Sequence, residues 1–154
     1  MADMTRVLVL NGPNLASLGR REPDVYGGRS LAEIEAELRE RAAALGVEVR
    51  IEQRNGEGEL IGLLETETGG SDAVVINPGG FSHTSVALLD ALRAFPGVIV
   101  EVHLTNTLRR ETYRRVMLTA EAADAVVLGL GASGYGIALE AAARMVQERR
   151  ELTR

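Results

Sequence analysis

The stretch VIVEVHLTN, residues 98–106, decides the fold and marks one place where chemistry is expected. Its first half is a run of branched apolar residues, which is typical of a strand buried on both faces of a parallel sheet. The pattern then breaks, because Glu101 and His103 lie two residues apart and project to the same side of an extended chain. A buried carboxylate and a buried imidazole are costly to desolvate unless they pair, so we expect Glu101 to orient or charge His103. The alternative is a core histidine beside a solvated strand-end charge.

Further strands are indicated on both sides of this stretch. Apolar runs predict buried strands, and alternation of apolar and polar residues predicts a half-buried edge strand. The buried runs are residues 6–10, 73–76 and 125–130, and the alternating segment is 47–53. Helical periodicity separates them, over residues 31–45, 59–68, 86–95 and 135–150. Strands that alternate with helices predict an α/β fold, a doubly wound parallel sheet with right-handed connections. Five strands in so short a chain predict the flavodoxin-like order 2-1-3-4-5.

Two helix starts carry capping signals. Ser30 and Glu33 have the spacing of a capping box, which satisfies backbone N–H groups at the first turn. Thr84 or Ser85 is placed to cap the helix that begins near residue 86. All 154 residues are therefore predicted to form a single domain, residues 1–154, with one long irregular loop at about 15–28.

Composition excludes several classes of function. The net charge of −5 and the scattered basic residues argue against a nucleic-acid surface. Cysteine is absent, which excludes disulfides, thiolate catalysis and cysteine metal sites. All 17 basic residues are arginine, so a Schiff-base or phosphate-loop lysine is excluded as well. No stretch has the length and apolarity of a membrane span, and the amino terminus lacks a signal-peptide layout, so a cytoplasmic protein is expected.

The loop at 15–28 shows no periodicity and contains Arg20, Arg21 and Tyr26. A loop of this length in a compact domain is usually functional or disordered, and glycines near its ends can serve as hinges. We favour a functional lid, because an aromatic residue and paired arginines are unusual in an idle connection. A solvated connection, with Tyr26 closing onto the surface, is the alternative.

Polar residues gather where the order of the predicted sheet reverses. In doubly wound sheets, ligands bind outside the carboxyl ends of the strands at this point. Three strands end there in polar segments, at residues 11–14, 77–83 and 101–106, so both histidines of the chain fall at one sheet edge. This coincidence favours a site. The candidates are Asn14, Arg21, Tyr26, Asn77, His83, Glu101, His103 and the arginines of segment 109–115.

Acid–base chemistry fits this set better than nucleophilic or metal chemistry. The chain has no Gly-x-Ser-x-Gly elbow, and although both histidines and Glu101 could ligate a metal, no metal-binding motif is present. His103 backed by Glu101 is suited to donate a proton. Tyr26 is the candidate base, but a tyrosine ordinarily has a pKa near ~10, and lowering it by two units requires about 2.7 kcal/mol. A guanidinium at about 4 Å supplies up to about 4 kcal/mol at an effective dielectric near 20, so an arginine must lie close to the phenol.

Separated motifs along the chain resemble the signatures of type II 3-dehydroquinate dehydratase. They are LNGPNL at 10–15, REPDVYG at 21–27, NPGGFSHTS at 77–85, EVHLTN at 101–106 and GLG at 129–131. The resemblance covers essentially the whole chain in order. It implies a flavodoxin-like lyase of the shikimate pathway that forms a homo-oligomer, a dodecamer built of trimers. It further implies that no metal or organic cofactor is needed. The implied reaction dehydrates 3-dehydroquinate to 3-dehydroshikimate by anti elimination through an enolate.

The same resemblance implies catalytic roles. Tyr26 matches the base that takes a proton from C2 of the substrate, and Arg21 matches the arginine that favours the tyrosinate. Asn14 matches the residue that holds a water against the enolate oxygen. His103 matches the acid that protonates the departing C1 hydroxyl, and Glu101 matches its supporting carboxylate.

Substrate-binding roles are implied too. The matching positions bind substrate hydroxyls or the carboxylate or, in one case, reach the neighbouring subunit's site. The groups that bind the substrate's hydroxyls and carboxylate are Asn77, His83, Arg114 and the backbone amides of Leu104 and Thr105. The residue that reaches the neighbouring subunit's site is Asp90.

The chain departs from the family pattern at a few positions. Gly56 stands where a histidine is frequent, Thr105 replaces a serine, Leu108 replaces an alanine, and Val116 and Met117 replace a His-Ser pair. None of these touches the expected acid or base. They leave open a related substrate, such as an amino analogue of dehydroquinate, or an altered assembly.

Two other functional hypotheses are compatible with the predicted fold. A flavodoxin-like binding module for flavin mononucleotide or a nucleotide needs hydroxyl donors after the first strand, and residues 11–14 offer none. A receiver-like signalling domain needs an acidic pair after the first strand and a lysine after the fifth, and both are missing.

Overall fold

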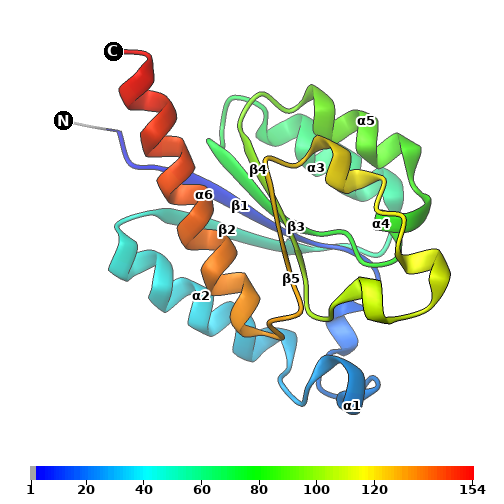
Figure 1. Cartoon of the computed structure of the whole chain (residues 1–154). Coiled ribbons are helices and arrows are strands. Elements are labelled where there is room, and N and C mark those ends of the chain that lie inside the picture. Colours follow the sequence, from blue (N-terminus) through cyan, green and yellow to red (C-terminus); the bar gives the residue numbers. More distant parts are fainter. Residues whose placement is uncertain (1–2) are drawn as a thin grey trace.

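The computed structural model describes residues 3–154, in which five parallel strands form one sheet with helices on both faces (Figure 1). The strand order is β2-β1-β3-β4-β5, and each neighbouring pair is parallel. This confirms the predicted order. The strands are β1 (Arg6–Asn11), β2 (Glu48–Gln53), β3 (Ala73–Asn77), β4 (Val98–His103) and β5 (Ala125–Leu128). The fifth strand ends earlier than predicted because Gly129 turns the chain with φ 86°.

Three of the four longer helices connect successive strands from β1 to β4, and the fourth follows β5. They are α2 (Leu31–Leu45), α3 (Glu57–Glu67), α5 (Val86–Ala94) and α6 (Ser133–Leu152). The Ser30 hydroxyl accepts a hydrogen bond from the Glu33 amide at the start of α2, which confirms Ser30 as the N-cap of this helix. Ser85 caps α5 in the same way, through the Leu88 amide. The shorter helices are α1 (Pro23–Tyr26), α4 (Phe81–Thr84), η1 (Leu15–Ser17), η2 (Thr107–Arg109), η3 (Thr112–Arg114) and η4 (Thr119–Ala122).

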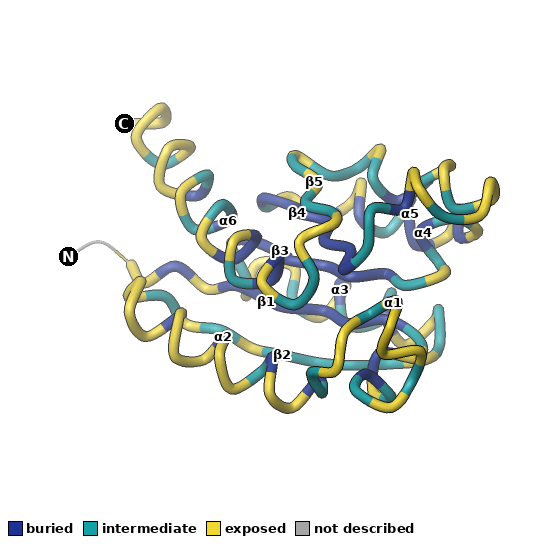
Figure 2. Tube along the Cα trace, turned by 60° about the horizontal axis from the view of Figure 1, so that its bottom comes forward, coloured by how far each residue is buried: buried dark blue, intermediate teal, exposed yellow. Residues whose placement is uncertain are grey.

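Alternate residues of β4 face different layers of the core. Val98, Val100 and Val102 pack in the cluster that α2 and α6 cover, whereas Ile99 packs in the cluster that α3 and α5 cover. The same alternation directs Glu101 and His103 to the side of Ile99. Figure 2 shows the central strands buried and the helices exposed on their outer sides.

Irregular segments cover the carboxyl edge of the sheet. The first is residues 12–30, which contains η1 and α1, and the second is residues 104–124, which contains η2, η3 and η4. The second segment returns over α4, where the Leu118 amide donates to the Ser82 carbonyl at 2.7 Å. Both therefore bring side chains to the ends of β1, β3 and β4. Between residues 3 and 154, every helix is too short or too polar to cross a bilayer.

Candidate active site

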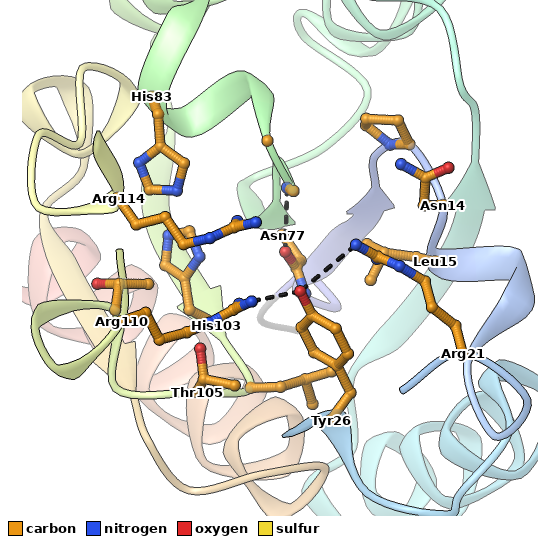
Figure 3. A pocket seen from close by; sticks show the side chains of 15 residues that line it. Asn14, Leu15, Arg21, Tyr26, Asn77, His83, His103, Thr105, Arg110 and Arg114 are labelled. Carbon is orange, nitrogen blue, oxygen red and sulfur yellow. Dashed lines mark hydrogen bonds between the residues drawn. The ribbon is translucent and has the colours of Figure 1, made fainter. Parts of the chain in front are cut away.

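A cavity of about 170 Å³ opens at the carboxyl ends of β1, β3 and β4 (Figure 3). It lies where the strand order reverses, as expected for this fold. Most of the predicted site residues line it: Asn14, Arg21, Tyr26, Asn77, His83, His103, Leu104, Thr105 and Arg114. The remaining lining residues are Pro13, Leu15, Gly79, Gly80, Thr107 and Arg110.

Glu101 and His103 form a buried pair at the end of β4. Glu101 is 0% exposed and His103 is 6% exposed, and Nε2 of His103 lies 2.7 Å from Oε2 of Glu101. Ser82 donates to the same oxygen at 3.0 Å, and the Thr119 hydroxyl donates to Oε1. Because an ionised carboxylate only accepts hydrogen bonds, Nε2 carries a proton and Nδ1 is the ring nitrogen left for the cavity. The alternative of a solvated charge at the strand end is therefore wrong.

His83 stands beside this pair on α4. Its ring stacks against that of His103 with centroids 6.2 Å apart, and its Nδ1 lies 2.7 Å from the carbonyl oxygen of Val116. A carbonyl only accepts, so Nδ1 carries the proton and Nε2 is free to accept one from a ligand. Burial lowers the pKa of His83, and the neighbouring His103 and Arg114 lower it further, against the bond to Val116. His83 is thus a neutral hydrogen-bond acceptor at pH 7.

Tyr26 presents its phenol to two guanidinium groups. Arg110 Nη1 donates to the phenol oxygen at 2.9 Å, and Arg21 Nη2 donates to it at 3.4 Å (Figure 3). Both guanidinium carbons also lie over the ring, at 4.7 Å for Arg21 and 5.0 Å for Arg110 from its centroid. Arginine has no acceptor and keeps its charge, so both guanidinium groups can only donate to the phenol oxygen.

Arg110 was not singled out in the sequence. Its only signal was membership of the arginine-rich segment 109–115, which follows directly after the strand that bears His103. The neighbouring Arg114 also lines the cavity, and its Nε donates to Glu111 at 2.7 Å. Arg110 follows directly after η2 and Arg114 ends η3, and helical or strand periodicity does not describe such short turns.

The predicted loop at 15–28 contains one turn of helix that carries Tyr26. Pro23 occupies the first turn of α1, and Glu22 before it adopts a left-handed conformation with φ 38°. Gly27 ends the turn with φ 88°, which favours glycine because a side chain is strained there. No residue of α1 is buried. Tyr26 itself is half-buried and packs against the core cluster, so its position is set by local backbone geometry, by the two arginines and by this partial packing.

The ends of β1 and β3 approach closely on the far side of the cavity. A Cβ on Gly12 would lie 2.6 Å from the carbonyl oxygen of Pro78, so this contact requires glycine. Asn14 follows with φ 69°, and its amide donates to Asn55 Oδ1 at 3.2 Å. Gln53 in turn donates to the Gly12 carbonyl at 3.1 Å. The end of β2 thereby supports the loop that presents Asn14.

A buried tyrosine on α6 holds Asn77. The Asn77 side-chain amide donates to the Tyr135 hydroxyl at 3.0 Å, and that hydroxyl donates to Asn11 at 2.6 Å. Asn77 also accepts from the Gly79 amide at 3.1 Å, which shapes the loop after β3. Burial raises the pKa of Tyr135, so it stays a neutral hydroxyl. The sequence contained no signal for this contact, because α6 begins more than fifty residues after Asn77.

Two of the predicted site residues lie outside the cavity lining. Glu101 lies behind His103, in the supporting position that was expected for it. Asp90 is exposed on α5, and its expected contact is with a neighbouring subunit, which a single chain does not test. Over residues 3–154, no three His, Asp or Glu side chains are grouped so that they could hold a metal ion.

The departures from the family pattern spare the site contacts. His83 bonds to the backbone carbonyl of Val116, so the side chain at that position is not needed for the contact and is 59% exposed. Met117 accepts from the Thr107 hydroxyl at 3.4 Å through its sulfur. Gly56 is the N-cap of α3, which begins at Glu57, two residues before the predicted start at residue 59.

Comparison with known proteins places this geometry in context. Residues 5–143 match the family model described as dehydroquinase class II. The chain is 49% identical over 138 residues to a 3-dehydroquinate dehydratase of Chelativorans sp., covering 89% of this chain and 95% of the relative. It is 47% identical over 136 residues to 3-dehydroquinate dehydratase 2 of Agrobacterium fabrum, covering 88% and 92%. The crystal structure of type II dehydroquinase from Propionibacterium acnes superposes with a TM-score of 0.88 at 36% identity, covering 93% and 99%.

Proposed function

The chain belongs to the class II dehydroquinase family, and on this basis we propose that it removes water from 3-dehydroquinate to give 3-dehydroshikimate. The observation that carries the proposal is the shared cavity of Tyr26 and His103. One of these side chains is flanked by two arginines, and the other is backed by a buried carboxylate. A base and an acid facing one small cavity are what a β-elimination of water next to a ketone requires.

Tyr26 is the proposed base. Its phenolate, stabilised by Arg21 and Arg110, takes a proton from C2 of the substrate, next to the C3 carbonyl. The electron pair of the broken C–H bond moves into the ring, and the C3 oxygen becomes the anionic oxygen of an enolate. Asn14 is proposed to hold a water that donates a hydrogen bond to this oxygen, which stabilises charge that develops only during the reaction.

His103 is the proposed acid. The enolate collapses, a double bond forms between C1 and C2, and the C1–oxygen bond breaks. The imidazolium of His103 gives its Nδ1 proton to the departing hydroxyl, which leaves as water. Glu101, bonded to Nε2 at 2.7 Å, stabilises the imidazolium before this transfer. Tyr26 and His103 reach the cavity from different elements, α1 and β4, which suits an anti elimination across the substrate ring.

Neighbouring groups are proposed to bind the substrate. The neutral His83 accepts a hydrogen bond from a substrate hydroxyl, and Asn77 bonds to another. Arg114 and the backbone amides of Leu104 and Thr105 bind the carboxylate. These roles rest on the lining of the cavity and on the family resemblance.

We further propose that residues 15–28 act as a lid and that the whole chain works as one catalytic domain. Leu15 and Leu18 anchor the start of this segment in the core, whereas the short helix α1 has no buried residue, so the proposed movement is confined to the part of the lid around α1. Assembly as a dodecamer, the contact of Asp90 with a neighbouring subunit, and a cytoplasmic location stay predictions.

A direct assay tests the proposed function. Purified protein mixed with 3-dehydroquinate should produce a conjugated enone, which is followed by its ultraviolet absorbance. The product should co-migrate with 3-dehydroshikimate in chromatography. A preparation that is folded and binds the substrate but yields no enone would contradict the proposal.

A further inference from the structure

Glu101 is held by more partners than a catalytic pair alone requires. Its carboxylate has no exposed area, and hydrogen bonds reach both of its oxygens. Oε2 accepts from His103 and Ser82, whereas Oε1 accepts from Thr119. Charge buried without such donors is strongly unfavourable, so each donor contributes to keeping the carboxylate ionised.

Thr119 is distant in sequence but fixed in space. It belongs to η4, in the long connection between β4 and β5 that also carries Arg110 and Arg114. The side chain is 0% exposed, and the preceding residue, Leu118, is tied to α4 by the hydrogen bond of its amide to the Ser82 carbonyl at 2.7 Å. The Thr119 hydroxyl lies 3.2 Å from that of Ser82, so the two hydroxyls lie side by side above the carboxylate.

The number of hydrogens available for donation shows what each of the two hydroxyls does. A hydroxyl has one hydrogen to donate, and the Ser82 hydrogen is used on Oε2. Thr119 is therefore the side chain that satisfies Oε1. Without Thr119, Oε1 would be buried with no hydrogen-bond donor, which is unfavourable for an ionised carboxylate. Glu101 would then tend to take up a proton, and the nearest one is that on Nε2 of His103.

We propose that Thr119 is a positioning residue: its hydroxyl keeps Glu101 ionised and oriented, so that Nε2 of His103 keeps its proton and the imidazole can also carry the reactive proton on Nδ1. This inference rests on the proposed dehydration, in which His103 supplies that proton. Thr119 does not line the cavity, so it acts on the reaction only through Glu101. Its loss should consequently slow the chemical step and leave substrate binding intact.

Three substitutions at this position separate the hydroxyl from the packing. Thr119→Val removes the hydroxyl and keeps the shape, Thr119→Ala removes it without any risk of overpacking, and Thr119→Ser keeps it. Thr5→Val is the matched control, because Thr5 is also buried at 2% exposure but lies at the opposite end of β1. Each variant is assayed for kcat and KM with 3-dehydroquinate, and its thermal unfolding is recorded to establish that it is folded.

We expect kcat to fall about tenfold or more in Thr119→Val and Thr119→Ala, as for loss of a hydrogen bond to a charged group, with KM within about twofold of the wild type. Thr119→Ser and Thr5→Val should keep kcat within about twofold.

Equal losses of kcat in the serine and valine variants would overturn the inference, because the packing and not the hydroxyl would then matter. An unchanged kcat in Thr119→Val or Thr119→Ala, or a change confined to KM, would overturn it too. A wild type without turnover would refute the proposed function along with it, whereas an active wild type with an equally active Thr119→Val would refute the inference alone.

Discussion

The two walls of the cavity are held by different means. The acid wall, made of Ser82, Glu101, His103 and Thr119, is buried and linked by hydrogen bonds throughout. The lid, residues 15–28, carries Tyr26 on a single helical turn with no buried residue. The phenol of Tyr26 is held instead by charged groups, with Arg110 at 2.9 Å and Arg21 at 3.4 Å.

This difference indicates how the two catalytic groups are prepared. The acid wall is assembled when the protein folds, so its geometry exists before any substrate arrives, and such preorganisation lowers the cost of reaction. The position of the base depends on where the lid lies, which is a frequent arrangement in enzymes that close over their substrates. Substitutions in the acid wall should therefore change both stability and rate, whereas those in α1, which has no buried residue, should change mainly the rate.

The largest effect on rate is expected from Tyr26→Phe. Removing the phenol oxygen removes the proposed base, so kcat should fall at least about a thousandfold. The free energy of unfolding, measured with urea, should hardly change because only the hydroxyl is lost and no residue of α1 is buried. Tyr113→Phe is the matched control, since Tyr113 is 63% exposed and does not line the cavity, and it should keep full activity. Wild-type turnover in Tyr26→Phe would exclude the phenol as the base.

His103→Ala should lower both the rate and the stability. Loss of the acid should reduce kcat by about a hundredfold or more. The buried carboxylate of Glu101 also loses a hydrogen-bond donor, which typically costs about 1–3 kcal/mol. Urea unfolding curves of His103→Ala and Tyr26→Phe, recorded side by side, measure the contrast. Equal stabilities of the two variants would show that the walls do not differ as described.

Arg110→Met tests the electrostatic support of the lid. Without this guanidinium the phenol oxygen loses its closer cationic donor, so kcat should fall at least about tenfold. Arg109→Met is the control, because the adjacent Arg109 is exposed and lies outside the cavity lining. Steady-state kinetics of both variants measure the difference, and a kcat of Arg110→Met equal to that of Arg109→Met would remove Arg110 from this role.

The smallest effect is expected at the lid hinge. Gly27 has φ 88°, where a side chain is strained, whereas Gly28 has open space around it and no positive φ. Gly27→Ala should lower kcat/KM several-fold by about 1–2 kcal/mol of backbone strain, and Gly28→Ala should be nearly neutral. Steady-state kinetics of the pair measure the difference. A larger loss in Gly28→Ala would mean that the hinge lies elsewhere.

The sequence predicted the sheet and the acid pair because both follow from short-range patterns. Period-two alternation places Glu101 and His103 on one side, and the order of strands and helices dictates which strand ends meet. The edge strand was equally readable from alternation at residues 47–53.

Contacts between irregular segments could not be predicted, because these segments have no short-range pattern. Arg110, Thr119 and Ser82 reach the site from short turns, where no periodicity tells which way a side chain points. Tyr135 contacts Asn77 from the buried face of α6. From the sequence alone, a tyrosine that only fills the core cannot be told from one whose hydroxyl supports a site residue. Only the three-dimensional arrangement distinguishes them.

The division of labour between the walls can be measured directly by exchange at C2 of 3-dehydroquinate in deuterated water, followed by NMR or mass spectrometry. If Tyr26 removes the C2 proton and His103 only expels water, His103→Ala should still incorporate deuterium at C2 while forming almost no 3-dehydroshikimate. Tyr26→Phe should do neither above the uncatalysed rate. Deuterium incorporation that persists in Tyr26→Phe and disappears in His103→Ala would contradict the assignment of base and acid.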